Sequence, residues 1–157
     1  MNHRLLGSLY IASGLVLGIV AYFLSIIMRI ELMRPAESLI SKQTPEIYNS
    51  SITLHGIGMI FLFAMPSLYG GWGNIKLPLV CLTPEVPFPR INNLSYLILV
   101  FSISLIATYM VGQTNNGLGW VLYPPLSTSA MSLSSLSLIG LCLGLVLNGL
   151  SLSLIHI

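Results

Sequence analysis

One histidine, His55, lies deep inside a long apolar stretch of this 157-residue chain. An ionisable side chain at membrane depth is costly, so it marks a candidate functional residue. Imidazole is the commonest protein ligand of haem iron, and the neighbouring Gly56 and Gly58 would let a flat macrocycle approach the helix. This residue alone leaves two interpretations open: a haem ligand, or a histidine that hydrogen-bonds a neighbouring helix as part of the packing.

Polar residues form a second candidate group between two apolar stretches: Asn74, Glu85, Asn92 and Asn93. A carboxylate followed by amides could form the mouth of a water-filled proton path; a capped, solvated loop is the alternative. Arg29 ends the first apolar stretch, and its fork of donors could hold a haem substituent at the membrane edge. An interfacial anchor that reaches to water is the other interpretation of Arg29.

A membrane must position these residues, because 55% of the chain is apolar, only 6% is charged and the mean hydropathy is +0.90. A bilayer core takes roughly 20 apolar residues per helix. Uncharged runs of that length lie at about 8–28, 50–72, 94–112 and 133–157. The sequence therefore predicts an all-α integral membrane protein with four transmembrane helices, forming a single membrane domain over 1–157.

Glycine, proline and charge patterns refine this prediction. Gly7, Gly14 and Gly18 form a small-residue stripe that lets another helix come close, and Pro66 predicts a kink in the second span. Four prolines from 78 to 89 predict an irregular connector rather than a regular helix. The net charge of +2 arises from residues scattered over the loops, so we expect no nucleic-acid partner.

Six blocks of sequence, in order, resemble subunit I of the haem–copper oxidases. They are NHRLLGSLY at 2–10, MRIEL at 28–32, EIYN at 46–49, ITLHGIGMIFLFAMPSLYGGWGNIKLPL at 52–79, PEVPFPRINN at 84–93 and GLGWVLYPPLSTS at 117–129. Each block alone is a weak signal, but their order makes the match specific. The resemblance implies that the four predicted helices correspond to helices I–IV of the family's twelve-helix subunit.

The resemblance assigns haem-binding roles to four residues. The family's histidine on helix II is an axial ligand of the low-spin haem and matches His55. The arginine that contacts the haem formyl group matches Arg29, while Trp120 and Tyr123 match residues near the haem propionates. These matches imply a low-spin haem A that is shared with a partner chain.

The resemblance also implies a proton channel. Its acidic entrance residue, ordinarily an aspartate, matches Glu85, and two channel asparagines match Asn74 and Asn92. The tyrosine of the family's first helix matches Tyr10, and Asn148 is the candidate for a third channel asparagine. Glu85 keeps the negative charge with a reach about one methylene longer than aspartate, which makes its channel role an expectation to be tested.

Metal sites other than the low-spin haem receive only partial matches. Glu31 matches the carboxylate of a peripheral calcium or sodium site, and Ala36 occupies the position of that site's backbone carbonyl. The family's copper-B ligands, second axial histidine and high-spin haem ligand are absent from the sequence. We therefore expect copper-B and the high-spin haem to lie in a partner chain, because this chain alone cannot reduce oxygen.

The leading hypothesis is a split catalytic subunit of cytochrome c oxidase. Other chains would supply the remaining subunit I helices, subunits II and III and further oxidase subunits, with cytochrome c as donor and membrane lipids around the complex. The alternatives are a non-catalytic membrane scaffold and the equivalent part of a quinol oxidase. Low charge, high hydropathy and the lack of a presequence predict a multi-pass protein of the mitochondrial inner membrane, with a bacterial cytoplasmic membrane as the alternative.

Overall fold

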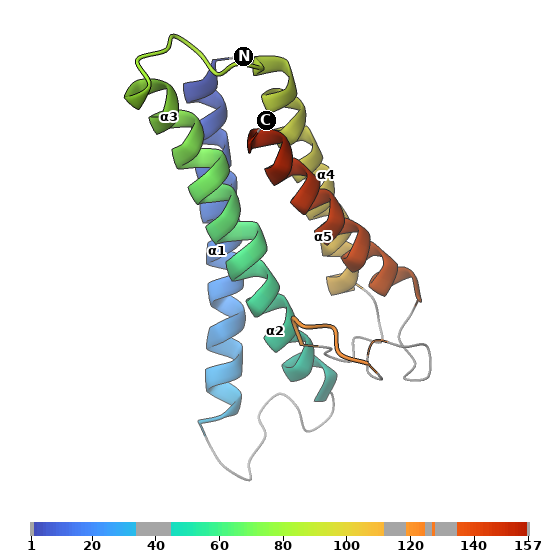
Figure 1. The fold of residues 1–157 in the computed structure, drawn as a ribbon. Coiled ribbons are helices and arrows are strands. Elements are labelled where there is room, and N and C mark those ends of the chain that lie inside the picture. Colours follow the sequence, from blue (N-terminus) through green and yellow to red (C-terminus); the bar gives the residue numbers. More distant parts are fainter. Residues whose placement is uncertain (1, 34–44, 112–118, 125–126, 128–134, 157) are drawn as a thin grey trace.

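A computed structural model describes residues 2–33, 45–111, 119–124, 127 and 135–156 of the chain. Its elements in chain order are α1 (His3–Glu31), α2 (Pro45–Ile57), the π-helical segments η1 (Gly58–Ala64) and η2 (Pro66–Gly73), α3 (Asn74–Val80), α4 (Pro89–Val111) and α5 (Ser135–His156). The elements from α2 to α3 form one continuous helix (Figure 1). Four helices are thus long and apolar enough to cross a membrane, which confirms the predicted all-α multi-pass fold.

The four spanning helices form two antiparallel pairs (Figure 1). In one pair α1 packs along the helix that runs from α2 to α3, and in the other α4 packs along α5. A cluster of buried apolar side chains joins the pairs: Leu54, Ile57, Leu62, Ile106, Tyr109 and Leu141. The chain termini and the α3–α4 connector lie at one end of the bundle, and α2 begins at the other.

Glycines bring the helices of each pair into close contact, as the small-residue stripe predicted. A Cβ atom added at Gly14 would meet Ser67 Oγ, and one added at Gly18 would lie 2.8 Å from the ring of Phe63. In the second pair, a Cβ added at Gly144 would lie 3.0 Å from the carbonyl oxygen of Ser102. Replacing these glycines would therefore force the helices apart.

The second spanning helix passes Pro66 as π-helical turns rather than ending there. Around Pro66 each backbone hydrogen bond joins an N–H to the carbonyl five residues earlier, as in the bond from the Met65 N–H to the Ile60 carbonyl. Proline has no N–H, so the next bond of this register, from residue 66 to the carbonyl of Phe61, cannot form. That carbonyl accepts a hydrogen bond from Asn148 Nδ2 of α5 instead, at 2.7 Å.

The prediction that the irregular connector begins at Pro78 was wrong, because α3 continues through Pro78 to Val80. The helix ends where Leu82 adopts a left-handed conformation with φ 54°. The Thr83 N–H then bonds to the Pro78 carbonyl at 3.0 Å and the Leu82 N–H to the Leu79 carbonyl at 3.4 Å. This pattern is a Schellman motif, which satisfies the last carbonyls of a helix. Leu82 occupies the left-handed position that glycine usually takes.

Candidate functional site

His55 lies on the last turn of α2 and faces α1. Its Nδ1 atom is 2.8 Å from the backbone carbonyl oxygen of Ala21. A carbonyl oxygen can only accept, so Nδ1 carries the proton and donates it. Nε2 is then the ring nitrogen left for another partner, and it hydrogen-bonds none of the residues that the structure describes. Histidines that ligate metals commonly have this arrangement, in which a second partner holds the other ring nitrogen.

The glycines beside His55 serve packing rather than leaving open space. A Cβ added at Gly58 would lie 3.0 Å from the Ala21 Cβ, so Gly58 is what allows α1 close enough for the His55–Ala21 bond. A Cβ added at Gly56 would lie 3.3 Å from the Cβ of Trp120. The expectation that both glycines leave a free face for a macrocycle is therefore corrected: neighbouring residues cover both positions.

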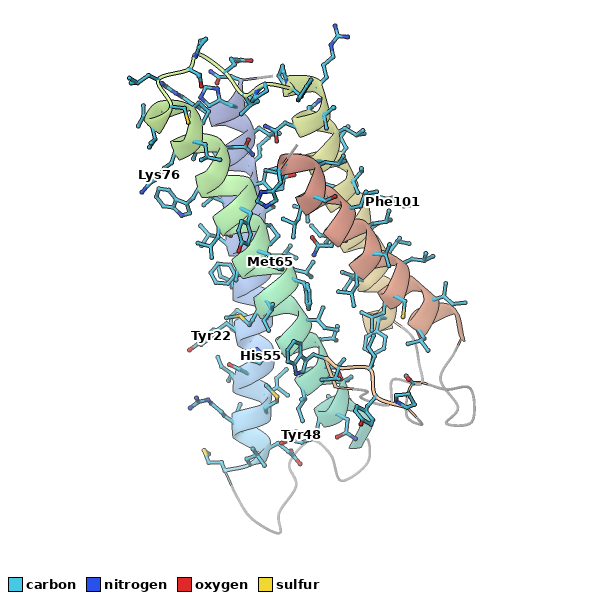
Figure 2. All side chains as sticks on the ribbon, viewed as in Figure 1. Tyr22, Tyr48, His55, Met65, Lys76 and Phe101 are labelled. Carbon is cyan, nitrogen blue, oxygen red and sulfur yellow. The ribbon has the colours of Figure 1, made fainter. Side chains whose placement is uncertain are left out.

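Trp120 belongs to a short segment, residues 119–124, that lies against α2 beside His55 (Figure 2). The Gly119 N–H donates to Thr53 Oγ1 at 2.9 Å, which attaches the segment to the helix. Trp120 is 53% exposed and Tyr123 is 69% exposed, so both side chains have large surfaces available to another group. The structure thus places Trp120 against Gly56, the residue after His55, while it gives Tyr123 only a place on the same segment.

Arg29 and Glu31 end α1 on the same half of the bundle as His55. Arg29 is exposed and lies eight residues beyond Ala21, which corresponds to about 12 Å along an α-helix. Glu31 is buried and has an interaction partner. Ala36, the other residue that the resemblance assigned to a cation site, lies outside the described residues.

Three of the predicted path residues meet at the opposite end of the bundle. Asn74 and Asn92 are buried, and Asn92 Nδ2 donates to Asn74 Oδ1 at 2.6 Å while Asn74 Nδ2 donates to the Gly70 carbonyl at 2.6 Å. Together with the exposed Glu85 they line a cavity of about 630 Å³ between α3, the α3–α4 connector and the end of α5. Asn93 is half-buried and is not part of this lining.

The cavity lining contains further ionisable groups. Lys76, Cys81 and His156 line it together with Glu85. The Lys76 ammonium lies 4.9 Å above the ring of Trp72, and the His156 ring meets the ring of Tyr69 edge-on with centroids 5.5 Å apart. No pattern in the sequence predicted His156 at this place, because it follows Glu85 by 71 positions in the chain.

Tyr10 is fully buried where α1, α4 and α5 meet. Its hydroxyl lies 2.7 Å from Ser95 Oγ and 3.5 Å from Ser151 Oγ. Ser95 Oγ donates to the Asn92 carbonyl and Ser151 Oγ donates to the Ser95 carbonyl, each at 2.6 Å. Since the Ser95 proton is directed to a carbonyl, the Tyr10 hydroxyl is the donor to Ser95. The sequence did not identify Ser95 and Ser151 as partners of Tyr10. The only feature that could have indicated them is a hydroxyl side chain within an apolar span.

Two buried amide oxygens have no hydrogen-bond partner among the described residues. These atoms are Asn92 Oδ1 and Asn148 Oδ1. A buried acceptor of this kind is normally satisfied by an ordered water or by another polar group. Asn92 and Asn148 therefore each retain an acceptor that a water could fill.

These features define a multi-pass helical membrane protein with a hydrogen-bonded histidine in one half and, at the other end, a cavity whose lining includes Glu85, Asn74 and Asn92. The chain matches the family described as "Cytochrome C and Quinol oxidase polypeptide I" over residues 5–156, and it belongs to that family. The membership that the six sequence blocks predicted is thus confirmed.

Curated relatives named cytochrome c oxidase subunit 1 agree with this assignment. The Plasmodium falciparum protein is 39% identical over 150 residues, which cover 96% of this chain and 32% of the relative. The Pecten maximus protein is 39% identical over 97% of this chain and 31% of the relative. The Cereibacter sphaeroides protein is 36% identical over 85% of this chain and 29% of the relative. The chain thus spans about a third of the length of these relatives.

Proposed function

We propose that this chain supplies helices I–IV of the catalytic subunit of a cytochrome c oxidase, with His55 as an axial ligand of a low-spin haem. The hydrogen bond from His55 Nδ1 to the Ala21 carbonyl carries the proposal, because it leaves Nε2 as the nitrogen that can ligate and fixes the orientation of the ring. Membership of the polypeptide I family supports the same role. One imidazole whose other ring nitrogen is already hydrogen-bonded fits one axial position of a haem iron.

Other residues near His55 would hold the periphery of the cofactor. The Arg29 guanidinium would bond a polar substituent at the membrane edge, and Trp120 and Tyr123 would lie near the haem carboxylates. When bound, haem A supplies reversible one-electron transfer, and the protein contributes ligation, orientation and electrostatics. The haem would be shared with a partner chain that provides the second axial ligand.

The polar end of the bundle would admit protons. Glu85 at the mouth of the cavity would exchange protons with water, and Asn74 and Asn92 would hold ordered waters at its base. The 630 Å³ cavity that these residues line supports this role. We extend the proposed proton path to Asn93 and Tyr10. We also propose Glu31 as a carboxylate of a peripheral calcium or sodium site.

Partner chains would complete the enzyme. The proposal places the remaining subunit I helices, copper-B and the high-spin haem in one or more other chains, next to subunits II and III, with cytochrome c as electron donor. The length of the relatives, about three times the matched region, supports the need for such helices. We place the complex in the mitochondrial inner membrane, in keeping with the relatives from Plasmodium and Pecten.

Replacing His55 with alanine tests the ligand assignment. We expect the low-spin haem band to disappear from the reduced-minus-oxidised spectrum of the intact complex purified in mild detergent. The matched control is His156→Ala, because His156 is exposed at the end of α5, far along the bundle from α2. A His55→Ala complex with a normal low-spin band would refute the assignment.

A further inference from the structure

Thr53 is fully buried on α2, two residues before His55, and its hydroxyl has two partners. Thr53 Oγ1 donates to the Asn49 carbonyl at 3.1 Å, one turn back along the helix. The same oxygen accepts the Gly119 N–H at 2.9 Å, across 66 positions of sequence. One hydroxyl thus joins the helix that carries His55 to the segment that carries Trp120.

The segment 119–124 forms a turn directly after the Gly119–Thr53 hydrogen bond. Gly119 has φ +71°, a left-handed conformation that glycine adopts without steric cost. The Leu122 N–H returns to the Gly119 carbonyl at 3.2 Å, which closes a turn, and the Leu122 side chain packs against the buried cluster that joins the helix pairs. The backbone is therefore fixed on both sides of Trp120.

Trp120 lies between these two anchors, which hold its backbone against α2. Its Cβ would be 3.3 Å from a Cβ at Gly56, the residue after His55, so the segment lies directly on the helix surface. If the Gly119 bond were lost, one of the two anchors beside Trp120 would be gone. The exposed half of the indole would then be free to change its position beside the ligand.

We propose that Thr53 is the positioning residue that holds Trp120 beside His55, and that it thereby sets the polar surroundings of a carboxylate-bearing cofactor at this site. The inference rests on the proposed function, since it assigns the cofactor periphery to this segment. Thr53 acts through the backbone of Gly119 and touches no reacting group. A valine of the same shape would remove both hydrogen bonds, whereas a serine would keep the hydroxyl.

The test compares Thr53→Val with Thr53→Ser in the intact complex. We expect valine to raise the hydrogen exchange rate of the Gly119 amide about fivefold, the effect of one lost hydrogen bond. We also expect valine to shift the midpoint potential of the low-spin haem while its absorption band persists. Serine should restore both values.

Three results would overturn the inference. They are an unchanged Gly119 exchange rate in the valine variant, faster exchange without a shift in midpoint potential, and a serine variant that behaves like valine. Failure of the proposed function is a separate observation, namely a wild-type complex without a low-spin haem band. In that case the cofactor part of the inference fails as well, while the exchange rates still report whether Thr53 holds the segment.

Discussion

At the scale of single residues, the orientation of His55 depends on a backbone atom, the carbonyl oxygen of Ala21. The Ala21 carbonyl can accept the hydrogen bond from His55 Nδ1 because its oxygen has two lone pairs and because Gly58 lets α1 approach. The sequence indicated the histidine, since an ionisable group in an apolar run is rare. It could not indicate its partner, because every residue carries a backbone carbonyl.

Glu85 is the residue whose role is easiest to separate from haem binding. It is exposed at the cavity mouth, at the opposite end of the bundle from His55, so Glu85→Gln should leave the haem spectra unchanged. We expect proton uptake during turnover to slow by at least about tenfold, in line with the loss of a positioned proton donor. Stopped-flow measurement with a pH indicator dye checks this result.

Glu85→Asp is the matched control, because it keeps the carboxylate and only shortens its reach. It should retain most of the proton uptake rate. Equal rates in the wild-type and Glu85→Gln complexes would exclude Glu85 from the path.

At the scale of helices, the sequence located Pro66 as a disturbance but gave no information on how the helix would accommodate it. The answer depends on a residue 82 positions away, because Asn148 of α5 donates to the Phe61 carbonyl that the proline leaves without a donor. Tertiary partners of this kind allow proline inside membrane helices. The end of α3 shows the same limit, since the Schellman motif there uses Leu82, which has no sequence signature of a helix end.

Asn148 and Pro66 should therefore be coupled in stability. Asn148→Leu leaves the Phe61 carbonyl buried without a donor, and we expect a loss of about 1–3 kcal/mol in the free energy of unfolding. In a Pro66→Ala background residue 66 regains its N–H, so the same asparagine substitution should cost less. A double-mutant cycle on thermal unfolding of the purified complex measures the difference.

The cycle has a clear negative outcome. If the two substitutions are additive, Asn148 does not compensate for the proline. Its fully buried side chain would then contribute through other contacts of α5.

At the scale of the whole molecule, strong hydropathy made four spanning helices predictable, and the order of the sequence blocks made the family predictable. The arrangement into two helix pairs was not predictable, because lipid-facing and helix-facing surfaces of membrane helices are equally apolar. Large side chains of α1 remain exposed in the single chain, including Leu15, Val16, Ile19 and Phe23. In the proposed assembly, lipids and partner helices share such surfaces.

Mass spectrometry of the complex that copurifies with this chain tests the split-subunit proposal. We expect a second membrane chain that contains the remaining family histidines, present in equal amount. The relatives named cytochrome c oxidase subunit 1 are about three times as long as the region that they share with this chain. A purified complex without such a chain would favour a non-catalytic scaffold.

The placement of the two sites at opposite ends of the bundle has an electrical consequence (Figures 1 and 2). A proton that enters at Glu85 and travels toward the His55 half moves through the membrane field. Moving one elementary charge across the whole membrane changes the free energy by about 2.3 kcal/mol per 100 mV. If Glu85 is the entrance that we propose, the rate of proton entry at this end should accordingly depend on the transmembrane voltage.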